Sequence, residues 1–481
     1  MTVPNFYQHV RRTLGQQADE VLLVWPGAGS AGAAATYTGR ELAARLGAYQ
    51  QLLAGQGVQP TQPVLLLLPV GVELICGLLA VMSRGAVPVL PPAGVSARGL
   101  LALRRRSGIR AALAPSKLAR RYGWLTRGLG LRLLSTPASA ADTPAQAPEP
   151  VAAGLPALVS HSSGSTGRPK AIRRSHQVLT AQHEVLRQVF PPWAGQRDFP
   201  LFPNVLLHNL AVGARTVLPD VPWGRLADFD PARVLAQLAE AGIETLTGNV
   251  FYFRRLLDHA RRHPVALPAV RAVGVGGSPV PEQLLQGLQE LLPQAAVYGI
   301  YGSSEAEPIA VRRYEPGAAP VDPRQGYCVG PVVAGLQCQL RGNGAGVELP
   351  DGRRAVGEIL VRGAHVAAEP GSWLATGDYG YFDDEQRLWL TGRQGNAAVH
   401  GGVQHYQLEH FLQHLPGVVR AAARATATGF TVYVQGTASP AEVTAALAAG
   451  FPAGLCNQVH LRAHLPVDSR HLSKILYDQL R

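Results

Sequence analysis

A loop rich in hydroxyl groups and glycine precedes one of only three lysines in the chain. The stretch SSGSTGRPK runs from Ser162 to Lys170, and the other two lysines are Lys117 and Lys474. The backbone N–H groups and hydroxyls of such a loop can turn toward a polyphosphate. A lysine adds a compact, mobile charge that can follow phosphate oxygens. These residue types predict polyphosphate binding, although a solvent-exposed turn can have the same composition.

The loop does not match the phosphate-binding loop of NTPases. That motif, G-x-x-x-x-G-K-[ST], opens a helix, whereas Pro169 precedes the lysine here and removes a backbone donor. The residues LPALVS before the loop and AIRRSH after it both have the pattern of a strand. We therefore expect a loop between two strands.

Buried strands and helices alternate in the region that carries this loop. Residues 64–69 have the pattern of a buried strand, residues 72–85 that of an apolar helix, and residues 86–92 that of another strand. Residues 64–82 are long enough to cross a bilayer, but Pro69, Gly71 and Glu73 interrupt them. We therefore predict a parallel α/β unit and no membrane span.

The remaining pattern divides the chain further. A second alternating region spans residues 229–302, short strands and turns follow residue 325, and mixed short helices and strands follow Arg393. We predict an α/β fold with a large N-terminal lobe, made of two doubly wound subdomains and a small β subdomain. A small, mobile α+β domain follows this lobe.

Composition excludes several classes of protein. The chain has 481 residues, 47% of them apolar, and a net charge of +12. Its arginines are scattered, aromatic residues make up only 6%, and no zinc-finger or heptad pattern occurs, so we predict no nucleic-acid partner. A basic surface that attracts anionic substrates or lipid fits at least as well. The four cysteines lie far apart, and the N-terminal residues lack an apolar signal segment, so we expect a cytoplasmic protein.

Several ordered motifs resemble those of the AMP-forming acyl- and aryl-acid ligases. This superfamily includes acyl-CoA synthetases, luciferases and the adenylation domains of peptide synthetases. SSGSTGRPK resembles its phosphate loop. The other matching stretches, in chain order, are TYTGREL (36–42), YGSSE (301–305), GEILVRG (357–363), TGDYGYFDDEQRLWLTGR (376–393) and SKIL (473–476). One Gly-rich loop is weak evidence, whereas these motifs cover nearly the full chain in the right order.

The resemblance implies an enzyme that activates a carboxylic acid with ATP and Mg²⁺. Attack of the carboxylate on the α-phosphate yields an acyl-adenylate and pyrophosphate, and it requires neutralised charge and aligned partners. Transfer to a thiol, that of CoA or of an acyl-carrier protein, would follow. The apolar stretches 202–213 and 247–253 are expected to form the acid pocket, with His208 nearby, and they favour a fatty, hydroxy-fatty or aryl acid.

The same resemblance assigns the residues that bind the nucleotide. Tyr301, followed by Gly302, offers a flat face for adenine, and Gly276 and Gly277 let the backbone approach the adenine edge. The expected phosphate-binding residues are Ser162, Ser163, Gly164, Ser165, Thr166, Gly167 and Lys170.

Four further residues complete the expected site. Ser304 can donate to the α-phosphate, and Glu305 is an oxygen ligand of the kind that Mg²⁺ prefers. Asp378 can accept from both ribose hydroxyls, and Arg393 can donate to the ribose or phosphate. The resemblance implies that Lys170 serves the β- and γ-phosphates.

The resemblance also implies a domain boundary and a role for the last lysine. We expect an AMP-binding domain over residues 1–392 and a mobile cap over residues 393–481, with a hinge at residues 394–396. Lys474 of the cap would reach the carboxylate and ribose oxygens during adenylation. Gly395 and Ser473 depart from the residues that are usual in the family. These departures leave open a nucleotide-binding sensor or scaffold that has lost catalysis.

The tail LPVDSRHLSKIL (465–476) is most similar to bacterial β-lactone synthetases of olefin biosynthesis. In those relatives a long-chain 3-hydroxy acid is the substrate, and its own hydroxyl displaces AMP. Lactone closure is therefore an alternative to thiol transfer. His400, His405 and His410 recur every five residues, which matches neither helix nor strand, so we expect surface or packing histidines rather than a metal site.

Overall fold

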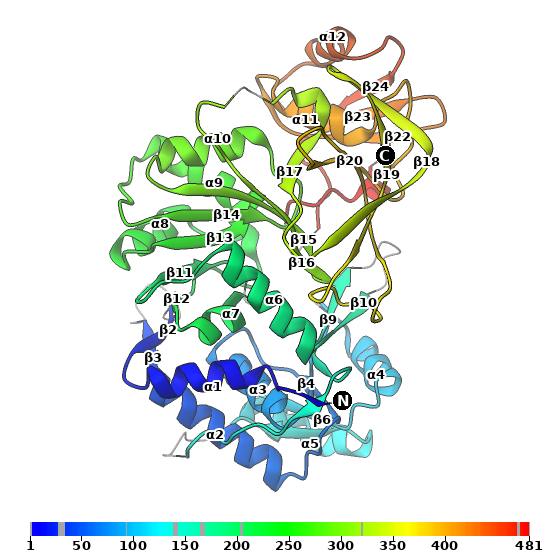
Figure 1. Cartoon of the computed structure of the whole chain (residues 1–481). Helices are drawn as coiled ribbons and strands as arrows, with labels where there is room; N and C mark the ends of the chain where they lie inside the picture. Colours follow the sequence, from blue (N-terminus) through cyan, green and yellow to red (C-terminus); the bar gives the residue numbers. More distant parts are fainter. Residues whose placement is uncertain are drawn as a thin grey trace. The chain divides into compact units, whose positions relative to one another are not determined.

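The structure is a computed structural model that describes residues 2–26, 34–92, 94–137, 143–163, 169–202, 205–318, 321–468 and 472–480. The chain divides into two compact units, Met1–Trp223 and Gly224–Arg481 (Figure 1). Within the described ranges, no helix combines the length and the hydropathy that a bilayer span requires.

A six-stranded sheet dominates the first unit. Its order is β10-β9-β5-β4-β6-β7, with β4 to β7 and β9 parallel and β10 antiparallel. The strands are β4 (Pro63–Leu66), β5 (Val87–Val89), β6 (Ala111–Ala114), β7 (Arg132–Ser135), β9 (Pro156–Ser163) and β10 (Pro169–Ser175). The predicted strands on both sides of the phosphate loop are confirmed, and so is the predicted strand-helix-strand unit that begins at β4.

Three helices connect the parallel strands of this sheet. They are α3 (Val72–Ser83), α4 (Ala97–Arg106) and α5 (Ser116–Gly128). The crossover through α3 leads from β4 to β5, toward the β10 edge of the sheet. The crossovers through α4, from β5 to β6, and through α5, from β6 to β7, lead toward the opposite edge. Because such crossovers are right-handed, α4 and α5 lie on the face opposite α3. Burial agrees, since Leu66 belongs to the core that contains α3, whereas Leu65 packs with Leu103 of α4.

The first unit also contains a second group of paired strands, together with further helices. β11 (Arg197–Pro200), β12 (Arg215–Val217) and β2 (Val21–Trp25) are parallel, and β3 (Ala35–Thr38) is antiparallel to β2. Thr38 and Glu41 form a capping box at the start of α2, which is a local sequence signal for the start of a helix. The remaining elements are β1 (Thr2–Val3), β8 (Val151–Ala152), α1 (Tyr7–Gln16), α2 (Gly39–Gly55), α6 (His176–Val189) and α7 (Val205–Val212).

The second unit begins with alternating helices and strands, as predicted. β13 (Thr245–Asn249), β14 (Ala272–Gly276) and β15 (Ala296–Ser303) are parallel, and β16 (Ala306–Arg313) turns back against β15. The helices are α8 (Pro231–Glu240), α9 (Val250–Arg262) and α10 (Glu282–Leu291). Asn249 ends β13 and caps α9, because its side chain accepts from the Tyr252 N–H at 2.9 Å.

A five-stranded antiparallel sheet follows, in the order β17-β21-β20-β19-β18. Its strands are β17 (Tyr327–Pro331), β18 (Gln337–Leu349), β19 (Gly352–Arg362), β20 (Leu374–Phe382) and β21 (Arg387–Arg393). β18 and β19 have 13 and 11 residues, so they are longer than the short strands that we expected. The turns within the sequence pattern, such as Gly342 to Gly346, are bulges inside a continuous β18–β19 ladder.

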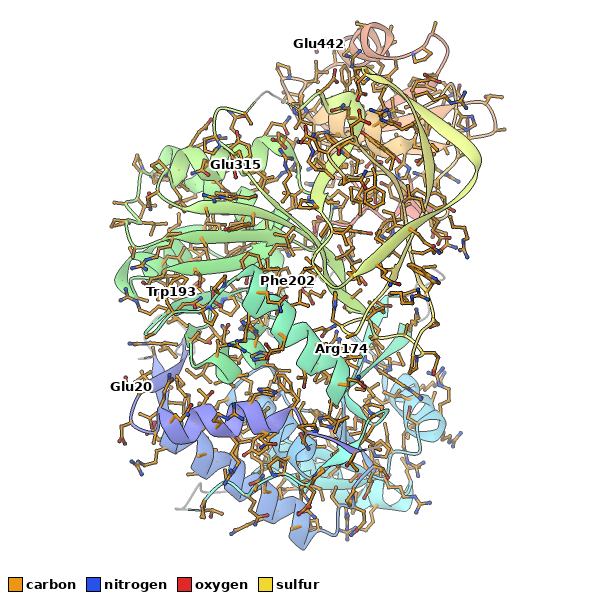
Figure 2. All side chains as sticks on the ribbon, in the orientation of Figure 1. Glu20, Arg174, Trp193, Phe202, Glu315 and Glu442 are labelled. Atoms are coloured by element: carbon orange, nitrogen blue, oxygen red, sulfur yellow. The ribbon has the colours of Figure 1, made fainter. Side chains whose placement is uncertain are left out.

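The last part of the chain has the predicted mixture of helices and strands. β22 (Val418–Ala425), β23 (Phe430–Gly436) and β24 (Cys456–Leu461) form a sheet, accompanied by α11 (His405–Gln413) and α12 (Pro440–Gly450). Glu442, labelled in Figure 2, forms a capping box with Ser439 at the start of α12. The predicted α/β fold is confirmed.

Candidate nucleotide site

A buried carboxylate lies where strands β20 and β21 pair. Asp378 is directly opposite Arg393 in the ladder, and the Arg393 guanidinium donates to Asp378 Oδ1. The Tyr301 hydroxyl donates to the other oxygen, Oδ2, at 2.9 Å. The Asp378 side chain is 10% exposed, whereas that of Arg393 is 47% exposed. The site therefore places a buried carboxyl group beside a guanidinium group that is about half exposed to solvent.

Electrostatics keep Tyr301 and Arg393 in fixed protonation states. Burial, together with the Asp378 carboxylate, raises the pKa of Tyr301 well above its ordinary value. The same carboxylate raises the pKa of Arg393. Tyr301 therefore remains a neutral donor and Arg393 a cation throughout the physiological range. The Asp378 backbone N–H also donates to Thr376 Oγ1 at 3.1 Å, which fixes the start of this turn.

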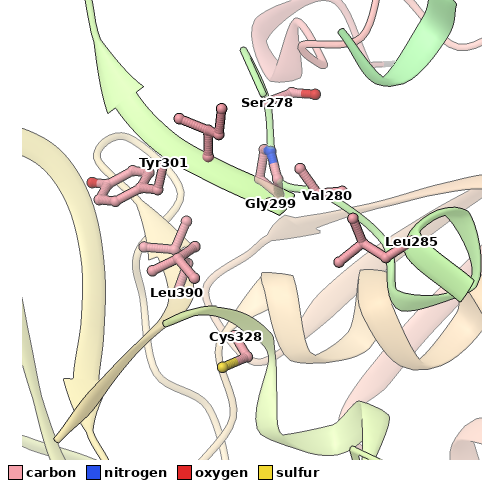
Figure 3. Close-up of a pocket in the computed structure, with 10 residues that line it drawn as sticks. Ser278, Val280, Leu285, Gly299, Tyr301, Cys328 and Leu390 are labelled. Carbon is pink, nitrogen blue, oxygen red and sulfur yellow. The ribbon is translucent and has the colours of Figure 1, made fainter. Parts of the chain in front are cut away.

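Tyr301 also borders a small cavity, shown with its neighbours in Figure 3. The other lining residues come from the segment after Gly277, from β15 and α10, and from β17 and β21: Ser278, Pro279, Val280, Leu285, Gly299, Ile300, Cys328, Val329 and Leu390. The cavity therefore lies between Tyr301 and the residues that directly follow the two glycines expected to approach adenine.

The two positions expected at the adenine edge, 276 and 277, require glycine for different structural reasons. A Cβ on Gly276 would lie 2.9 Å from the Ile300 carbonyl oxygen, so the packing of β14 on β15 requires glycine there. Gly277 has a φ of +84°, which other residues adopt with strain. Packing thus accounts for Gly276 by itself, and its contact with adenine stays a prediction.

Ser304 and Glu305 form the turn between β15 and β16. The Ala367 N–H donates to the Glu305 carbonyl at 2.7 Å, which anchors this turn. A Cβ on Gly302 would lie 2.9 Å from the Ala306 carbonyl oxygen, so the tight hairpin requires a glycine. Among the residues that the structure describes, no group of three His, Cys, Asp or Glu could hold a metal. One carboxylate, that of Glu305, suits Mg²⁺, which keeps water ligands and binds substrate phosphates.

The phosphate loop belongs to the first unit. Lys170 is exposed and lies opposite Ser162 in the β9–β10 ladder, and Ser163 is the last residue of β9. Gly164, Ser165, Thr166 and Gly167 lie outside the described residues. Their predicted contacts with phosphate stay predictions.

Lys474 lies on a short turn near the C-terminus. Val467 and Ile475 form a β-bridge. The Lys474 N–H donates to Asp468 Oδ1 at 3.0 Å, and the Asp468 N–H donates to the Lys474 carbonyl at 3.0 Å. These backbone bonds fix the turn, while Lys474 as a residue is exposed.

Comparison with known proteins identifies the family. A family model described as AMP-binding enzyme matches residues 10–369, which is most of the chain. The chain belongs to the AMP-binding enzyme family. It is an AMP-forming carboxylic acid ligase, which activates its acid with ATP.

Individual relatives of this AMP-binding enzyme cover nearly all of it. An olefin β-lactone synthetase of Stenotrophomonas maltophilia is 31% identical over 85% of this chain and 82% of its own length. A 4-chlorobenzoate–CoA ligase of an Arthrobacter species is 25% identical over 79% of this chain and 76% of its own. The structure of an O-succinylbenzoate CoA synthetase of Bacillus subtilis, in complex with ATP and magnesium, has a TM-score of 0.77 at 19% identity. It covers 100% of both chains, and at this identity the likeness shows the fold alone.

Two residues that the sequence motifs do not include hold the tail of this AMP-binding enzyme. The Tyr477 hydroxyl donates to both oxygens of Glu409, at 2.8 and 3.0 Å. Glu409 is 4% exposed, and the Ala423 N–H donates to its Oε1 at 2.9 Å. Tyr477 comes three residues after Lys474, so this buried contact anchors the segment that carries the lysine. The only sequence signal was a lone glutamate in helix α11.

The Glu409 contact predicts a distinctive pH dependence of stability. Burial raises the pKa of Glu409 to about 8, so the folded protein holds a proton that the unfolded chain loses above about pH 5. Glu409 therefore stabilises the fold fully below that pH, and this contribution falls as pH rises to about 8. Glutamine stays neutral throughout. Between pH 5 and pH 8.5, we expect the free energy of unfolding of Glu409→Gln to rise by about 3 kcal/mol relative to that of the wild type. Thermal or denaturant unfolding measures this difference.

Glu442→Gln is the matched control, because the pKa of this exposed helix-capping glutamate is lowered by its bonds to Ser439. Its free energy of unfolding should not rise relative to that of the wild type as pH rises. A pH-independent difference between Glu409→Gln and the wild type would contradict the proposed protonation of Glu409.

The histidines named above have packing roles. His405 and His410 are 0% and 2% exposed, and their rings lie against Tyr406 and Tyr327 at 4.3 and 4.6 Å between centroids. In the first unit, His208 Nδ1 lies 3.1 Å from His183 Nδ1, and burial lowers the pKa of His208 to about 3. His208 is therefore a neutral residue of the packing between helices α6 and α7.

Proposed function

We propose that this enzyme adenylates an apolar 3-hydroxy acid and then closes it to a β-lactone. The observation that carries this proposal is the similarity to the olefin β-lactone synthetase of S. maltophilia, which covers 85% of this chain and 82% of that relative. The tail LPVDSRHLSKIL supports it, because this segment carries Lys474 and departs from the tail that is usual in the family. The apolar stretches 202–213 and 247–253 were expected to form the acid pocket, and their role in binding a hydrocarbon chain stays part of this proposal.

The reaction has two steps, each with a defined leaving group. In the first, a carboxylate oxygen attacks the α-phosphorus of ATP, and the bond to pyrophosphate breaks. In the second, the oxygen of the substrate's 3-hydroxyl attacks the acyl carbon. The hydroxyl proton is lost, the bond to AMP breaks, and a four-membered ring forms. ATP and the hydroxy acid thus give β-lactone, AMP and pyrophosphate, with no further nucleophile.

We propose a role for each residue in these steps, supported for Asp378, Arg393 and Tyr301 by their mutual contacts and for the others by the sequence motifs alone. Asp378 accepts from the ribose hydroxyls, Arg393 donates to the ribose or the α-phosphate, and Tyr301 stacks on adenine. Ser304 binds the α-phosphate. Mg²⁺, held by Glu305, supplies charge neutralisation on the phosphate oxygens when bound. Lys170 and the phosphate loop bind the β- and γ-phosphates, and Lys474 stabilises the charge that develops during adenylation.

We also propose that the residues after Gly395 move as a cap about this glycine, while Arg393 stays in strand β21. The Gln394 N–H donates to the Gly377 carbonyl at 2.7 Å, which ties Gln394 to the sheet before it. The Asn396 side chain donates to the Ala423 carbonyl at 2.8 Å and accepts from the Ala425 N–H at 2.7 Å, which ties Asn396 to the cap. Gly395 between them has a φ of +86°, and no atom lies within 4 Å of the position of a Cβ. Rotation at this residue would break neither attachment. It would break the bonds that join the cap to the sheet elsewhere, such as those from Thr391 Oγ1 to Gln404 Oε1 at 2.6 Å and from the Glu348 N–H to the Gly402 carbonyl at 2.7 Å.

Transfer of the acyl group to a thiol is the second candidate for the final step. The similarity to a 4-chlorobenzoate–CoA ligase favours it, and CoA or an acyl-carrier protein would then be the acceptor. A cytoplasmic location fits either reaction, because ATP and such acceptors are available there.

Product analysis separates the two candidates. We expect ATP, Mg²⁺ and a racemic long-chain 3-hydroxy acid to give stoichiometric AMP and a β-lactone, detected by mass spectrometry and by its carbonyl stretch, in the absence of CoA. The corresponding acid without the hydroxyl should give pyrophosphate exchange but no lactone. AMP formation that requires added CoA, with a thioester as the product, would contradict lactone closure and favour the second candidate.

A further inference from the structure

One segment of the first unit carries many cations and no acidic residue. Residues 74–141 contain eleven Lys and Arg residues, Arg84 and ten more from Arg98 to Arg132, but neither Asp nor Glu. The segment includes helices α4 and α5, which lie on one face of the six-stranded sheet (Figure 1). The Arg104 side chain donates to the Gly130 carbonyl at 3.0 Å and joins the ends of the two helices. Arg84 ends α3 on the other face, whereas the basic residues of α4 and α5 gather on one side of the sheet.

Most of these cations face solvent. Arg105 and Arg106 at the end of α4, Arg110 after it, and Lys117, Arg120 and Arg121 on α5 are all exposed. Because no acidic residue occurs within the segment, no carboxylate of these helices can neutralise them. Such a face has a positive potential that attracts anionic surfaces.

Large apolar side chains lie among the cations of α5. None of the residues of this helix is buried. Trp124 is 75% exposed and Leu125 is 47% exposed, and Leu129 just after the helix is 43% exposed. At 100° per residue, Lys117, Arg121, Trp124 and Leu125 share the outward side of α5. Exposed Trp and Leu cost solvation in water, so this combination indicates a partner with both an apolar and an anionic layer.

We infer that the α4–α5 face, defined by the six cations above with Trp124, Leu125 and Leu129, binds the surface of an anionic lipid bilayer. The charges match in sign, and each Lys or Arg near an anionic membrane surface adds attraction. The tryptophan ring suits the headgroup region, and Arg stems can lie along acyl chains while their heads stay in water. A helix of this kind rests in the interface and does not cross the bilayer.

This surface would place the enzyme where an apolar acid concentrates. That consequence rests on the proposed function, whereas the binding itself does not. The two can fail separately, because vesicle binding needs neither ATP nor an acid.

The test uses flotation of the full chain with vesicles of phosphatidylcholine alone or with about one-third phosphatidylglycerol. We expect wild-type protein to float with the anionic vesicles at low salt and to be released as salt rises. The double variant Arg120→Glu and Arg121→Glu should weaken binding by at least about 30-fold. Trp124→Ser should weaken it several-fold and abolish the blue shift of tryptophan fluorescence that vesicles cause.

The matched control is Arg11→Glu with Arg12→Glu, an exposed pair on α1 of the same unit, which changes the net charge equally. It should bind within about twofold of the wild type. Activity on a short, water-soluble acid should be unchanged in all variants, which checks their folding. Absence of wild-type binding, or equal losses in both double variants, would overturn the proposal. A third result would also overturn it. If Trp124→Ser binds vesicles normally, and the Arg120→Glu, Arg121→Glu variant loses binding to duplex DNA as well as to vesicles, the face is a general polyanion site rather than a membrane site.

Discussion

Replacing Lys474 with glutamine should lower the rate of acyl-adenylate formation by about 10³-fold. Negative charge from the carboxylate and the α-phosphate meets in the transition state, and an ammonium group stabilises it where glutamine offers only a dipole. Lys474 is exposed on a turn held by backbone bonds to Asp468 and by the Tyr477–Glu409 contact. The variant should therefore fold normally. ATP–pyrophosphate exchange, dependent on the acid, measures this step.

Lys117→Gln provides the control for Lys474→Gln, because Lys117 is another exposed lysine that lies outside all the ligase motifs. It should exchange pyrophosphate within about twofold of the wild type. Supplying presynthesised acyl-adenylate bypasses the first step, and Lys474→Gln should then release AMP at close to the wild-type rate. If both steps slow equally, the cap does not withdraw Lys474 between them and the hinge at Gly395 is wrong.

Replacing Asp378 with asparagine should raise the KM for ATP by about 100-fold, which corresponds to about 2–3 kcal/mol of lost charge-assisted hydrogen bonding. The carboxylate accepts from Arg393 and Tyr301 and is expected to accept from the ribose as well. The amide of asparagine offers only one acceptor oxygen, so it cannot satisfy these donors together. It also leaves Arg393 without a buried anionic partner, so the thermal stability should fall too. Steady-state kinetics at varied ATP and a melting curve measure both effects.

Asp384→Asn is the matched substitution, since Asp384 also pairs with an arginine, Arg354, but its side chain is 86% exposed. Exposed ion pairs contribute little to the free energy of folding, so the KM for ATP and the melting temperature of Asp384→Asn should stay near the wild-type values. An Asp378→Asn variant that is destabilised yet keeps the wild-type KM for ATP would show that Asp378 is structural. Tyr301→Phe should have a milder effect than Asp378→Asn, because it keeps the flat ring and loses one hydrogen bond.

The elements that position the site follow largely from local sequence. VFYFRRLLDHARR has helical spacing of apolar residues after an asparagine cap, and α9 spans those 13 residues. Thr38 and Glu41 form a capping box that marks the start of α2. The Pro169 argument against an NTPase-type loop also holds, because β9 and β10 are antiparallel strands rather than a strand and a helix.

Long-range contacts could not be predicted in this way. Glu409 and Tyr477 are 68 residues apart, and no local pattern pairs a helical glutamate with a tyrosine of the tail. Gly276 illustrates a second limit, because packing against Ile300 and approach to adenine both require the absence of a side chain. The arginines that look scattered along the sequence gather on one face only because the crossover rule puts α4 and α5 on the same side of the sheet.

The central claim is that the chain forms an acyl-adenylate from an apolar acid, and acid-dependent exchange of labelled pyrophosphate into ATP tests it most directly. A panel of 3-hydroxy fatty, unsubstituted fatty and aryl acids should give exchange that requires both Mg²⁺ and acid, strongest with the long-chain hydroxy acids. If folded protein binds ATP but exchanges no pyrophosphate with any acid of the panel, the chain is a nucleotide-binding scaffold and the proposed reaction is wrong.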